Sequence, residues 1–170
     1  MRRLVLFIAT SLDGYIAGPG GEIDWLFSDQ DYGYREFFAG VDTVLMGRKT
    51  WELSLTFGED VYEGRQQYVF TRTPRPPAGK VTFVSDPVAP LVGALKQREG
   101  GTLWLIGGAQ IAGECVRAGL IDEYRIFVHP LILGAGIALF PPGTPTTRLR
   151  LTGSRAFDTG LMQLDYMPLS

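Results

Sequence analysis

The sequence predicts an α/β protein with a mixed central sheet, largely parallel, that gains antiparallel strands toward the C-terminus. One observation is that short apolar runs alternate with helix-like stretches as far as about Leu120, an order that favours parallel strands with crossover helices. A second is that only strand-like segments follow Asp122. A third is that the chain has no repeat, low-complexity tract or linker, so we expect a single domain over residues 1–170.

Composition and charge narrow the class of partner. A hydrophobic content of 45% and a charged content of 20% are typical of a globular protein. The net charge of -2 gives no reason to expect nucleic acid or an anionic membrane as partner, and no stretch is apolar enough to span a bilayer. The single cysteine, Cys115, fits a reducing compartment, so we expect a cytoplasmic protein.

Histidine and cysteine are too sparse for a metal site. The one histidine, His129, stands before Pro130, and no His or Cys cluster has metal-ligand spacing. A serine-hydrolase triad would have to rest on this one residue. We therefore expect no metal, and we assign His129 to a strand end without a catalytic role.

The N-terminal part predicts a buried strand, a loop and a helix. Residues 3–10 form a continuous apolar run, which is the pattern of a strand buried on both faces. The Gly-Pro-Gly-Gly segment at 18–21 cannot hold regular structure, so we expect a mobile loop there. Ser28, with Asp31 three residues on, resembles a helix N-cap and predicts a helix over residues 29–39.

The rest of the chain continues the alternation and then departs from it. The strands from 123 onward are expected to be antiparallel. The expected later strands are residues 43–46, 67–71, 81–84, 102–106, 123–128, 131–133, 149–154 and 161–167. The expected later helices are a short one from about Lys49, ended by residues 57–60, and two more at 86–98 and 109–118.

The site hypothesis starts from the turn Met46-Gly47-Arg48-Lys49-Thr50, where an apolar strand runs through a glycine into a helix. Such a junction offers unpaired backbone N–H groups and the positive end of a helix dipole, which together favour a phosphate. The two cations add charge. The alternative is an ordinary strand-to-helix turn with solvated cations.

Two further strand ends strengthen the hypothesis, because ligands of open α/β sheets bind where the carboxyl ends of strands gather. Thr71 and Arg72 follow one strand and suit an isolated phosphate. Gly107-Gly108 follows another and opens a helix. A pyrophosphate plus a separate phosphate fits NADP(H) better than NAD(H). The fingerprint G-x-G-x-x-G is absent, and glycines that simply make turns remain the alternative for Gly107-Gly108.

These motifs resemble a known family. Ser11-Leu12-Asp13-Gly14-Tyr15-Ile16-Ala17, Met46-Gly47-Arg48-Lys49-Thr50-Trp51-Glu52 and Ile106-Gly107-Gly108-Ala109 stand in the order and spacing of dihydrofolate reductase. Two later motifs, Ile121-Asp122-Glu123-Tyr124-Arg125-Ile126 and Pro130-Leu131-Ile132-Leu133-Gly134-Ala135-Gly136, look more like the reductase domain of the bifunctional riboflavin-biosynthesis deaminase/reductase. The chain is thus similar to the small stand-alone members of this dihydrofolate reductase-like group.

The resemblance implies a three-layer fold with about eight strands, and it implies NADPH as cofactor, with residues 18–24 as a lid. The implied cofactor residues are Ala9 and Ile16 beside the nicotinamide, Gly47, Arg48, Lys49 and Thr50 at the pyrophosphate and adenosine side, Thr71 and Arg72 at the 2′-phosphate, and Ile106, Gly107, Gly108, Ala109, Gln110 and Ile111 around the second glycine turn.

The proton donor and the substrate pocket are open between alternatives. Reduction of a C=N bond needs a proton on nitrogen, which a carboxyl group near the ring can supply. The position of the acid in dihydrofolate reductase falls on Asp31, and Asp13 is the second candidate; a helix-start carboxylate and a turn-forming Asp are the structural alternatives. Trp25, Tyr34 and Phe38 are candidates for a flat ring pocket, although aromatic residues at helical spacing also suit a core.

We therefore expect an NADPH-dependent reductase of a small heteroaromatic substrate, either pterin- or folate-like or an aminopyrimidine of the riboflavin-pathway type. The alternative is a non-catalytic dinucleotide-binding dimeric domain. A homodimer is expected in either case, because residues 124–133 and 161–167 read as apolar edge strands of the kind that such reductases pair.

Overall fold

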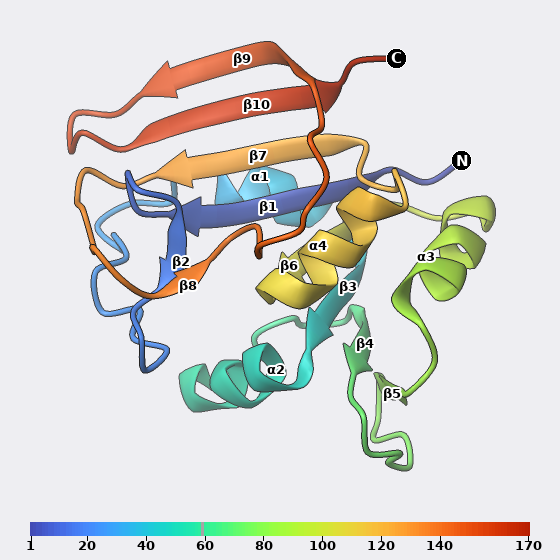
Figure 1. The fold of residues 1–170 in the computed structure, drawn as a ribbon. Coiled ribbons are helices and arrows are strands. Elements are labelled where there is room, and N and C mark those ends of the chain that lie inside the picture. Colours follow the sequence, from blue (N-terminus) through green and yellow to red (C-terminus); the bar gives the residue numbers. More distant parts are fainter. Residues whose placement is uncertain (59) are drawn as a thin grey trace.

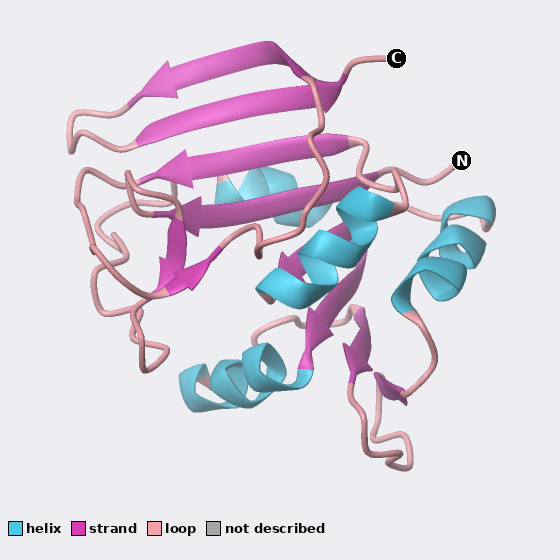
Figure 2. Cartoon of the chain, viewed as in Figure 1, coloured by secondary structure: helices cyan, strands magenta, loops and turns pink. Residues whose placement is uncertain are grey.

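A computed structural model describes residues 1–58 and 60–170, so Glu59, expected in the break after the second helix, lies outside the described residues. The main sheet has eight strands, with α3 and α4 on one face and α1 on the other, which makes three layers (Figure 1). Figure 2 shows the same layers by element type. The predicted three-layer α/β fold with a mixed sheet is confirmed.

The elements follow the predicted alternation. The strands are β1 (Leu4–Thr10), β2 (Tyr15–Ala17), β3 (Val41–Gly47), β4 (Gln66–Phe70), β5 (Val81–Val84), β6 (Thr102–Gly107), β7 (Glu123–Val128), β8 (Ile137–Ala138), β9 (Leu149–Ala156) and β10 (Met162–Pro168). The helices are α1 (Tyr34–Ala39), α2 (Arg48–Ser54), the 3-10 turn η1 (Leu55–Phe57), α3 (Val88–Gln97) and α4 (Ala109–Arg117). No helix in these described ranges is long and apolar enough to cross a membrane.

The strand order of the main sheet is β5-β4-β3-β6-β1-β7-β10-β9. The first six in this order are parallel to their neighbours, and β10 and β9 are antiparallel. The carboxyl ends of β4, β3, β6, β1 and β7 therefore lie along one edge of the sheet, and their amino ends lie along the other. We call these the carboxyl edge and the amino edge.

Two expectations about the C-terminal strands were wrong. β7 runs parallel to β1, not antiparallel, because α4 carries the chain back across the sheet before β7 starts, as a crossover helix does. Residues 131–133 form no strand; the Leu131 carbonyl instead accepts the Leu12 N–H at 2.8 Å, so this segment closes the end of the β1 turn.

The strands that were expected to form a dimer edge lie inside the sheet. β7 is bonded to β1 and β10, and β10 is bonded to β7 and β9. The outermost strands of the eight-stranded sheet, each paired on one side only, are β5 and β9. The predicted segments therefore cannot pair with a second copy as outer strands, whereas β9 is an outer strand that can.

The first helix is shorter than predicted. α1 begins at Tyr34, where the sequence predicts a helix from residue 29 capped by Ser28. Tyr32 has φ 52° and the N-cap Gly33 has φ 81°, so two successive left-handed residues separate the 28–31 segment from the helix. The sequence 22–33 is consequently a loop that runs from β2 toward α1.

The structure also contains a two-stranded sheet of β2 and β8, and β8 is a strand that the sequence did not predict. β8 follows Gly136, whose φ is 150°, and a Cβ at this position would clash with the Ala17 carbonyl oxygen. Only glycine allows this close backbone approach. The glycines of the quoted 130–136 motif thus bring the chain back against the β2 segment.

The core has one part on each face of the sheet. Successive side chains of a strand point to opposite faces, so neighbouring residues of one strand join different parts. Leu45 packs with Leu105 and Val92 beneath α3 and α4, whereas Val44 and Met46 pack with Trp104 beneath α1. The Trp104 ring is the centre of an aromatic cluster with Phe7, Tyr34, Phe37, Phe38 and Tyr62.

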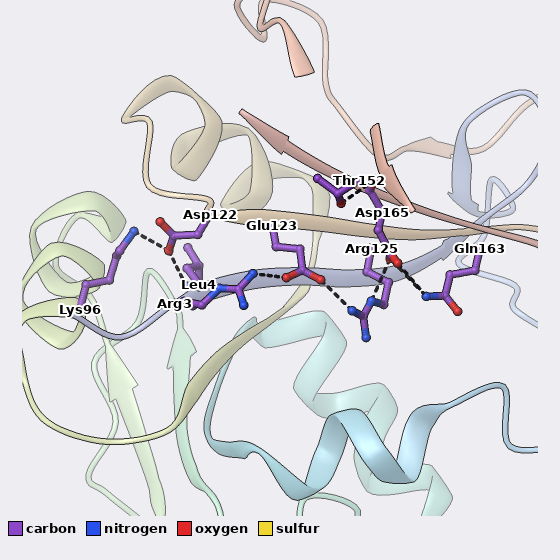
Figure 3. Close-up of polar contacts among 9 residues, drawn as sticks. All are labelled: Arg3, Leu4, Lys96, Asp122, Glu123, Arg125, Thr152, Gln163 and Asp165. Atoms are coloured by element: carbon purple, nitrogen blue, oxygen red, sulfur yellow. Dashed lines mark hydrogen bonds and ion pairs between the residues drawn. The ribbon is translucent and has the colours of Figure 1, made fainter. Parts of the chain in front are cut away.

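The amino edge is held together by ion pairs between elements, several of which are drawn in Figure 3. Glu123 at the start of β7 binds Arg3 and also Arg125, the latter at 2.8 Å, and Arg125 reaches Asp165 of β10 at 2.9 Å. The other members are Lys96 with Asp122 at 2.7 Å, and Arg2 with Asp42. These contacts fasten β1, β3, β7, β10 and α3 at this edge, away from the strand ends that carry the predicted site.

Candidate active site at the carboxyl edge

Three strand ends that the sequence analysis connects lie side by side. Gly47 at the end of β3 is the register partner of Phe70, which directly precedes Thr71. Met46 is the partner of Gly107 on the opposite side of β3. The two glycine turns and the Thr71-Arg72 corner therefore follow one another along the carboxyl edge.

The two glycine turns approach each other at backbone distance. A Cβ built on Gly47 would lie 3.7 Å from the Gly108 nitrogen and 3.7 Å from Ile111 Cγ1. A Cβ on Gly108 would lie 3.9 Å from Thr50 Oγ1. We call the space bordered by Gly47, Gly107, Gly108 and the start of α4 the glycine cradle.

Backbone donors face this region at the start of α4. Its N-cap is Gly108, and no side chain caps the helix. The first N–H groups of a helix have no acceptor within the helix, and the helix dipole makes them attractive to an anion. Ala109 and Gln110 supply such groups, so the cradle has the donors that a pyrophosphate needs.

The cations near the cradle differ in what they already bind. Arg48 pairs with Glu52 at 2.8 Å within α2. Lys49 and Arg72 are exposed and form no ion pair among the described residues. Thr71 Oγ1 accepts the Thr73 N–H at 3.3 Å. A hydroxyl and an uncommitted guanidinium thus stand together at the corner after β4.

A pocket of about 360 Å³ opens beside the cradle, at the carboxyl ends of β1, β6 and β7. This volume suits a small ligand. Four predicted site residues line it: Ala9, Asp31, Tyr34 and Ile106. The remaining lining residues are Phe7, Ile8, Leu26, Phe27, Gln30, Tyr32, Trp104, Phe127, His129 and Leu161. We call this space the ring pocket, because six of its lining residues are Phe, Tyr or Trp and a seventh is His129.

Asp31 stands on the loop that forms one wall of the ring pocket. Its carboxylate accepts the Arg35 N–H through both oxygens at 3.3 Å, and its Oδ1 lies 3.7 Å from Arg35 Nε. Asp31 therefore bonds a backbone N–H at the start of α1 and also lines the ring pocket. Burial raises the pKa of the nearby Tyr34 hydroxyl, and the charge of Asp31 adds to this increase.

Asp13 has a different set of contacts. It accepts the Ser11 hydroxyl at 2.6 Å and the N–H groups of Leu133 and Gly134 at 3.1 and 2.8 Å. These hydrogen bonds, the one from Ser11 foremost, lower the pKa of the Asp13 carboxyl. Asp13 does not line the ring pocket; it fastens the 131–134 segment to the turn after β1.

His129 lies in the wall of the ring pocket, although the sequence analysis gave it no part in the site. Its side chain is 3% exposed, its Nδ1 lies 3.1 Å from the Phe127 carbonyl oxygen, and its Nε2 accepts the Phe27 N–H at 3.2 Å. Donation to a carbonyl and acceptance from an N–H define a neutral imidazole with the proton on Nδ1. Burial lowers the pKa of His129, which favours this neutral form.

The remaining predicted pocket residues lie behind or beside the pocket. Trp25 packs edge-on against His129, with 5.2 Å between ring centroids. Phe38 stacks on Tyr34 at 5.4 Å, and the Arg65 guanidinium lies 3.8 Å from its ring centroid. Ile16 packs against the core beneath α3 and α4. Within residues 1–58 and 60–170, no group of three or more His, Cys, Asp or Glu could hold a metal ion.

The comparisons with known proteins address the family directly. The family model described as the RibD C-terminal domain matches residues 2–163 of the chain. The chain belongs to the RibD C-terminal domain family. The resemblance to the reductase domain of the riboflavin-biosynthesis deaminase/reductase is thereby confirmed.

Two relatives match most of the chain. The chain is 39% identical to the Bacillus subtilis protein YwjB, described as uncharacterized, over 98% of each sequence. It is 29% identical to a putative dihydrofolate reductase of Caenorhabditis elegans, over 74% of this chain and 71% of that protein.

Solved structures of the RibD type share the fold. A putative riboflavin biosynthesis protein from Shewanella sp. PV-4 has a TM-score of 0.86 at 28% identity and covers 99% of both chains. The Thermotoga maritima diaminohydroxyphosphoribosylaminopyrimidine deaminase/5-amino-6-(5-phosphoribosylamino)uracil reductase has a TM-score of 0.74 at 18% identity, and the present chain spans 57% of its length.

Proposed function

We propose that this protein is an NADPH-dependent reductase that adds hydride to a small heteroaromatic ring in the cytoplasm. The observation that supports it is the continuity of the two spaces through β6. Ile106 lines the ring pocket, and the next two residues, Gly107 and Gly108, border the glycine cradle. A cofactor that spans from a pyrophosphate to a reactive ring matches this pairing of spaces.

The residues of the carboxyl edge fit NADPH. The cradle has room at Gly47 and Gly108 for a close backbone approach, and it has the uncapped start of α4. Lys49 and Arg72 supply charge, and the pair Thr71 and Arg72 suits the 2′-phosphate. When bound, the nicotinamide would supply the hydride.

The work of the chain itself is positioning and proton supply. The aromatic wall excludes water from the ring pocket and holds a flat substrate by stacking. Asp31 is the proposed proton donor, because it is the one carboxylate among the described residues that line this pocket. Asp13 suits the role less well, because its three hydrogen bonds stabilise the ionised carboxylate.

The ring pocket favours a reductase over the non-catalytic alternative. The pocket of about 360 Å³ beside the cradle has room for a small ring, and Asp31 in its lining is a group that can supply a proton. RibD-type relatives further support a reductase of the riboflavin-pathway kind, and the putative dihydrofolate reductase from Caenorhabditis elegans supports the same chemistry.

We also propose a homodimer that pairs through β9. This strand is at the end of the sheet, and Leu151 on it is exposed. An unpaired strand of this kind offers backbone donors and acceptors to a second copy. Light scattering at micromolar concentration should give twice the chain mass, and a monomer would contradict this part of the proposal.

The test of the proposed function is a parallel fluorescence titration with NADPH and NADH. The parent protein should bind NADPH with clear preference. Arg72→Ala should weaken NADPH by about tenfold or more, as the loss of a charge-assisted hydrogen bond predicts, and leave NADH nearly unchanged.

Arg75→Ala is the matched control for this titration. Arg75 lies on the same loop, but its guanidinium faces the Phe83 ring at 5.6 Å. It should leave both affinities unchanged. Equal weakening of NADPH and NADH by Arg72→Ala would refute the 2′-phosphate role, and binding of neither cofactor to the parent would overturn the proposed function.

A further inference from the structure

We infer that the ring pocket selects a planar heterocycle that carries N–H donors and no phosphate. This inference rests on the proposed function, because it names the substrate class of the same pocket. It also separates this chain from a 5-amino-6-(5-phosphoribosylamino)uracil reductase such as the Thermotoga maritima protein.

The charges that line the pocket carry the inference. Asp31 is the one formally charged side chain among the described lining residues, and no Lys or Arg is among them. His129 is held in its neutral form by Phe27 and Phe127. The other polar lining groups are the uncharged side chains of Gln30, Tyr32 and Tyr34.

The loop that forms one wall of the pocket adds further negative charge. The loop from residue 22 to 33 contains Glu22, Asp24, Asp29 and Asp31 and no Lys or Arg. The Tyr32 hydroxyl, which lines the pocket, donates to Asp29 at 2.5 Å, so a second carboxylate stands directly behind the lining. Carboxylates at this wall would repel a phosphate monoester, and no Lys or Arg among the described lining residues would offset the repulsion.

Three arginines on neighbouring elements contact carboxylates or aromatic rings. Arg35 has a side chain that is 91% exposed and faces Asp31. The Arg155 guanidinium lies over the Phe157 ring at 4.6 Å, and Phe157 in turn packs against Tyr32. Arg125 is bound by Glu123 and Asp165. None of these three arginines is among the residues that line the pocket.

The same groups define what the pocket does accept. Phe7, Phe27 and Phe127 offer apolar ring surface for stacking. Asp31 is a carboxylate acceptor at the pocket, which favours the amino and ring N–H groups of an aminopyrimidine or a pterin. The volume of about 360 Å³ lies at the lower end of ligand sites, so it suits one or two fused rings with short substituents.

The test compares a matched pair of compounds: 5-amino-6-(5-phosphoribosylamino)uracil and its dephosphorylated form. Binding to the cofactor-free protein is followed by tryptophan fluorescence, because Trp104 lines the pocket and Trp25 packs on its wall. The dephosphorylated compound should bind at least about tenfold more tightly, a difference of about 1.4 kcal/mol.

A charge substitution in the wall should reverse part of this preference. Gln30→Lys adds a cation to the lining and should raise the affinity for the phosphorylated compound about tenfold. Gln97→Lys makes the same change in charge at the end of α3, at the amino edge, and should leave both affinities unchanged.

The outcomes separate this inference from the proposed function. Equal or tighter binding of the phosphorylated compound by the parent, or binding of neither compound, overturns the inference. If NADPH binds in the cofactor titration while the phosphorylated compound is preferred, the proposed function stands and the substrate class is wrong. If the dephosphorylated compound is preferred but NADPH does not bind, the substrate preference stands and the reductase proposal falls.

Discussion

The two edges of the sheet use their charged residues in opposite ways. At the amino edge and along β7, four of five ion pairs among the described residues join residues far apart in sequence, and the fifth, Arg125 with Glu123, lies within β7. At the carboxyl edge, the two ion pairs in the described ranges, Arg48 with Glu52 and Arg35 with Asp31, each join residues four apart in sequence. Charged residues of the amino edge mostly pair with partners distant in sequence. Those of the carboxyl edge pair with a residue one helical turn away or are exposed.

Burial explains why the amino edge must be paired. The side chains of Arg2 and Lys96 are only 6% and 9% exposed. Arg2 is satisfied by Asp42, Gly101 and Thr43, and Lys96 by Asp122 and the Leu120 carbonyl. A buried charge without such partners would cost several kcal/mol. This edge is therefore structural, and the exposed cations of the other edge are free to meet a ligand.

The largest expected effect tests whether charge at the carboxyl edge serves catalysis. Asp31→Asn keeps an oxygen that can accept the Arg35 N–H but removes the acid. The kcat of NADPH-dependent reduction should fall by about 10²- to 10⁴-fold, the usual contribution of a general acid. NADPH affinity and the free energy of unfolding should not change. Steady-state kinetics, cofactor titration and urea unfolding measure the three quantities.

Asp13→Asn is the matched control, because it makes the same substitution at a carboxylate that holds the 131–134 segment. It should leave kcat within about threefold, since no general-acid step depends on it. A larger loss of kcat in Asp13→Asn than in Asp31→Asn would reverse the assignment of the proton donor.

The second effect tests whether charge at the amino edge serves stability. Asp42→Ala leaves the buried Arg2 guanidinium without its carboxylate and also removes the acceptor of the Gly101 N–H. The free energy of unfolding should fall by about 1 to 3 kcal/mol, because the Arg2 guanidinium is buried although Asp42 is half exposed. Urea unfolding measures it, and NADPH affinity should be unchanged.

Glu52→Ala makes the same kind of change at the carboxyl edge, where it removes the partner of Arg48. An exposed pair four residues apart on a helix contributes only about 0.3 to 0.5 kcal/mol. If the two variants lost equal stability, the contrast between the edges would not hold.

The third effect tests the space between the glycine turns. Gly47 has φ -78°, and a Cβ there would meet its neighbours at 3.7 Å, an ordinary contact. Gly47→Ala should therefore fold with the free energy of unfolding changed by less than about 0.5 kcal/mol. NADPH affinity should fall by about tenfold, because the methyl group occupies the cradle.

Gly93→Ala is the control for this change. Gly93 lies inside α3, and a Cβ there would meet nothing within 4 Å. It should raise the free energy of unfolding by about 0.5 to 1 kcal/mol, because alanine favours helix, and leave cofactor binding unaffected. Unchanged NADPH affinity in Gly47→Ala would mean that the cradle does not hold the pyrophosphate.

The smallest expected effect is a pH dependence of the free energy of unfolding that arises from His129. Its pKa is lowered in the fold, mainly by burial, so the unfolded chain binds more protons near the ordinary pKa of 6.5. The free energy of unfolding should therefore be constant above this pH and fall as the pH decreases below it, by less than about 1.4 kcal/mol per pH unit for one proton. Protonation would also place an N–H against the Phe27 N–H and release this wall of the pocket.

The chain has one histidine, so this pH window is easily assigned. Burial raises the pKa of Cys115 to about 12, which removes the thiol from the same window. His129→Asn should abolish the loss of stability between neutral pH and about pH 5, measured by urea unfolding. A loss of stability that persists in the variant would exclude His129 as its source.

The carboxyl edge was predicted well where its signals are local. One apolar run ends at Met46 and the other at Ile106, and each is followed directly by its own glycine turn. Parallel strands bring such turns to one edge by rule, and Met46 and Gly107 are indeed register partners. The α1 start was wrong because the left-handed Tyr32 and Gly33 are not visible in a capping pattern.

The sequence by itself determined the alternation of strands and helices as far as α4, the two glycine turns and the family. Only the tertiary structure decided that Asp31 lines the ring pocket, that Asp13 holds a distant loop and that His129 supports a wall. The contacts of Asp13 and His129 join residues 120 and 102 positions apart. A capping box or a glycine turn is encoded by neighbours in the chain, whereas a contact over such a separation exists only after the whole sheet has formed.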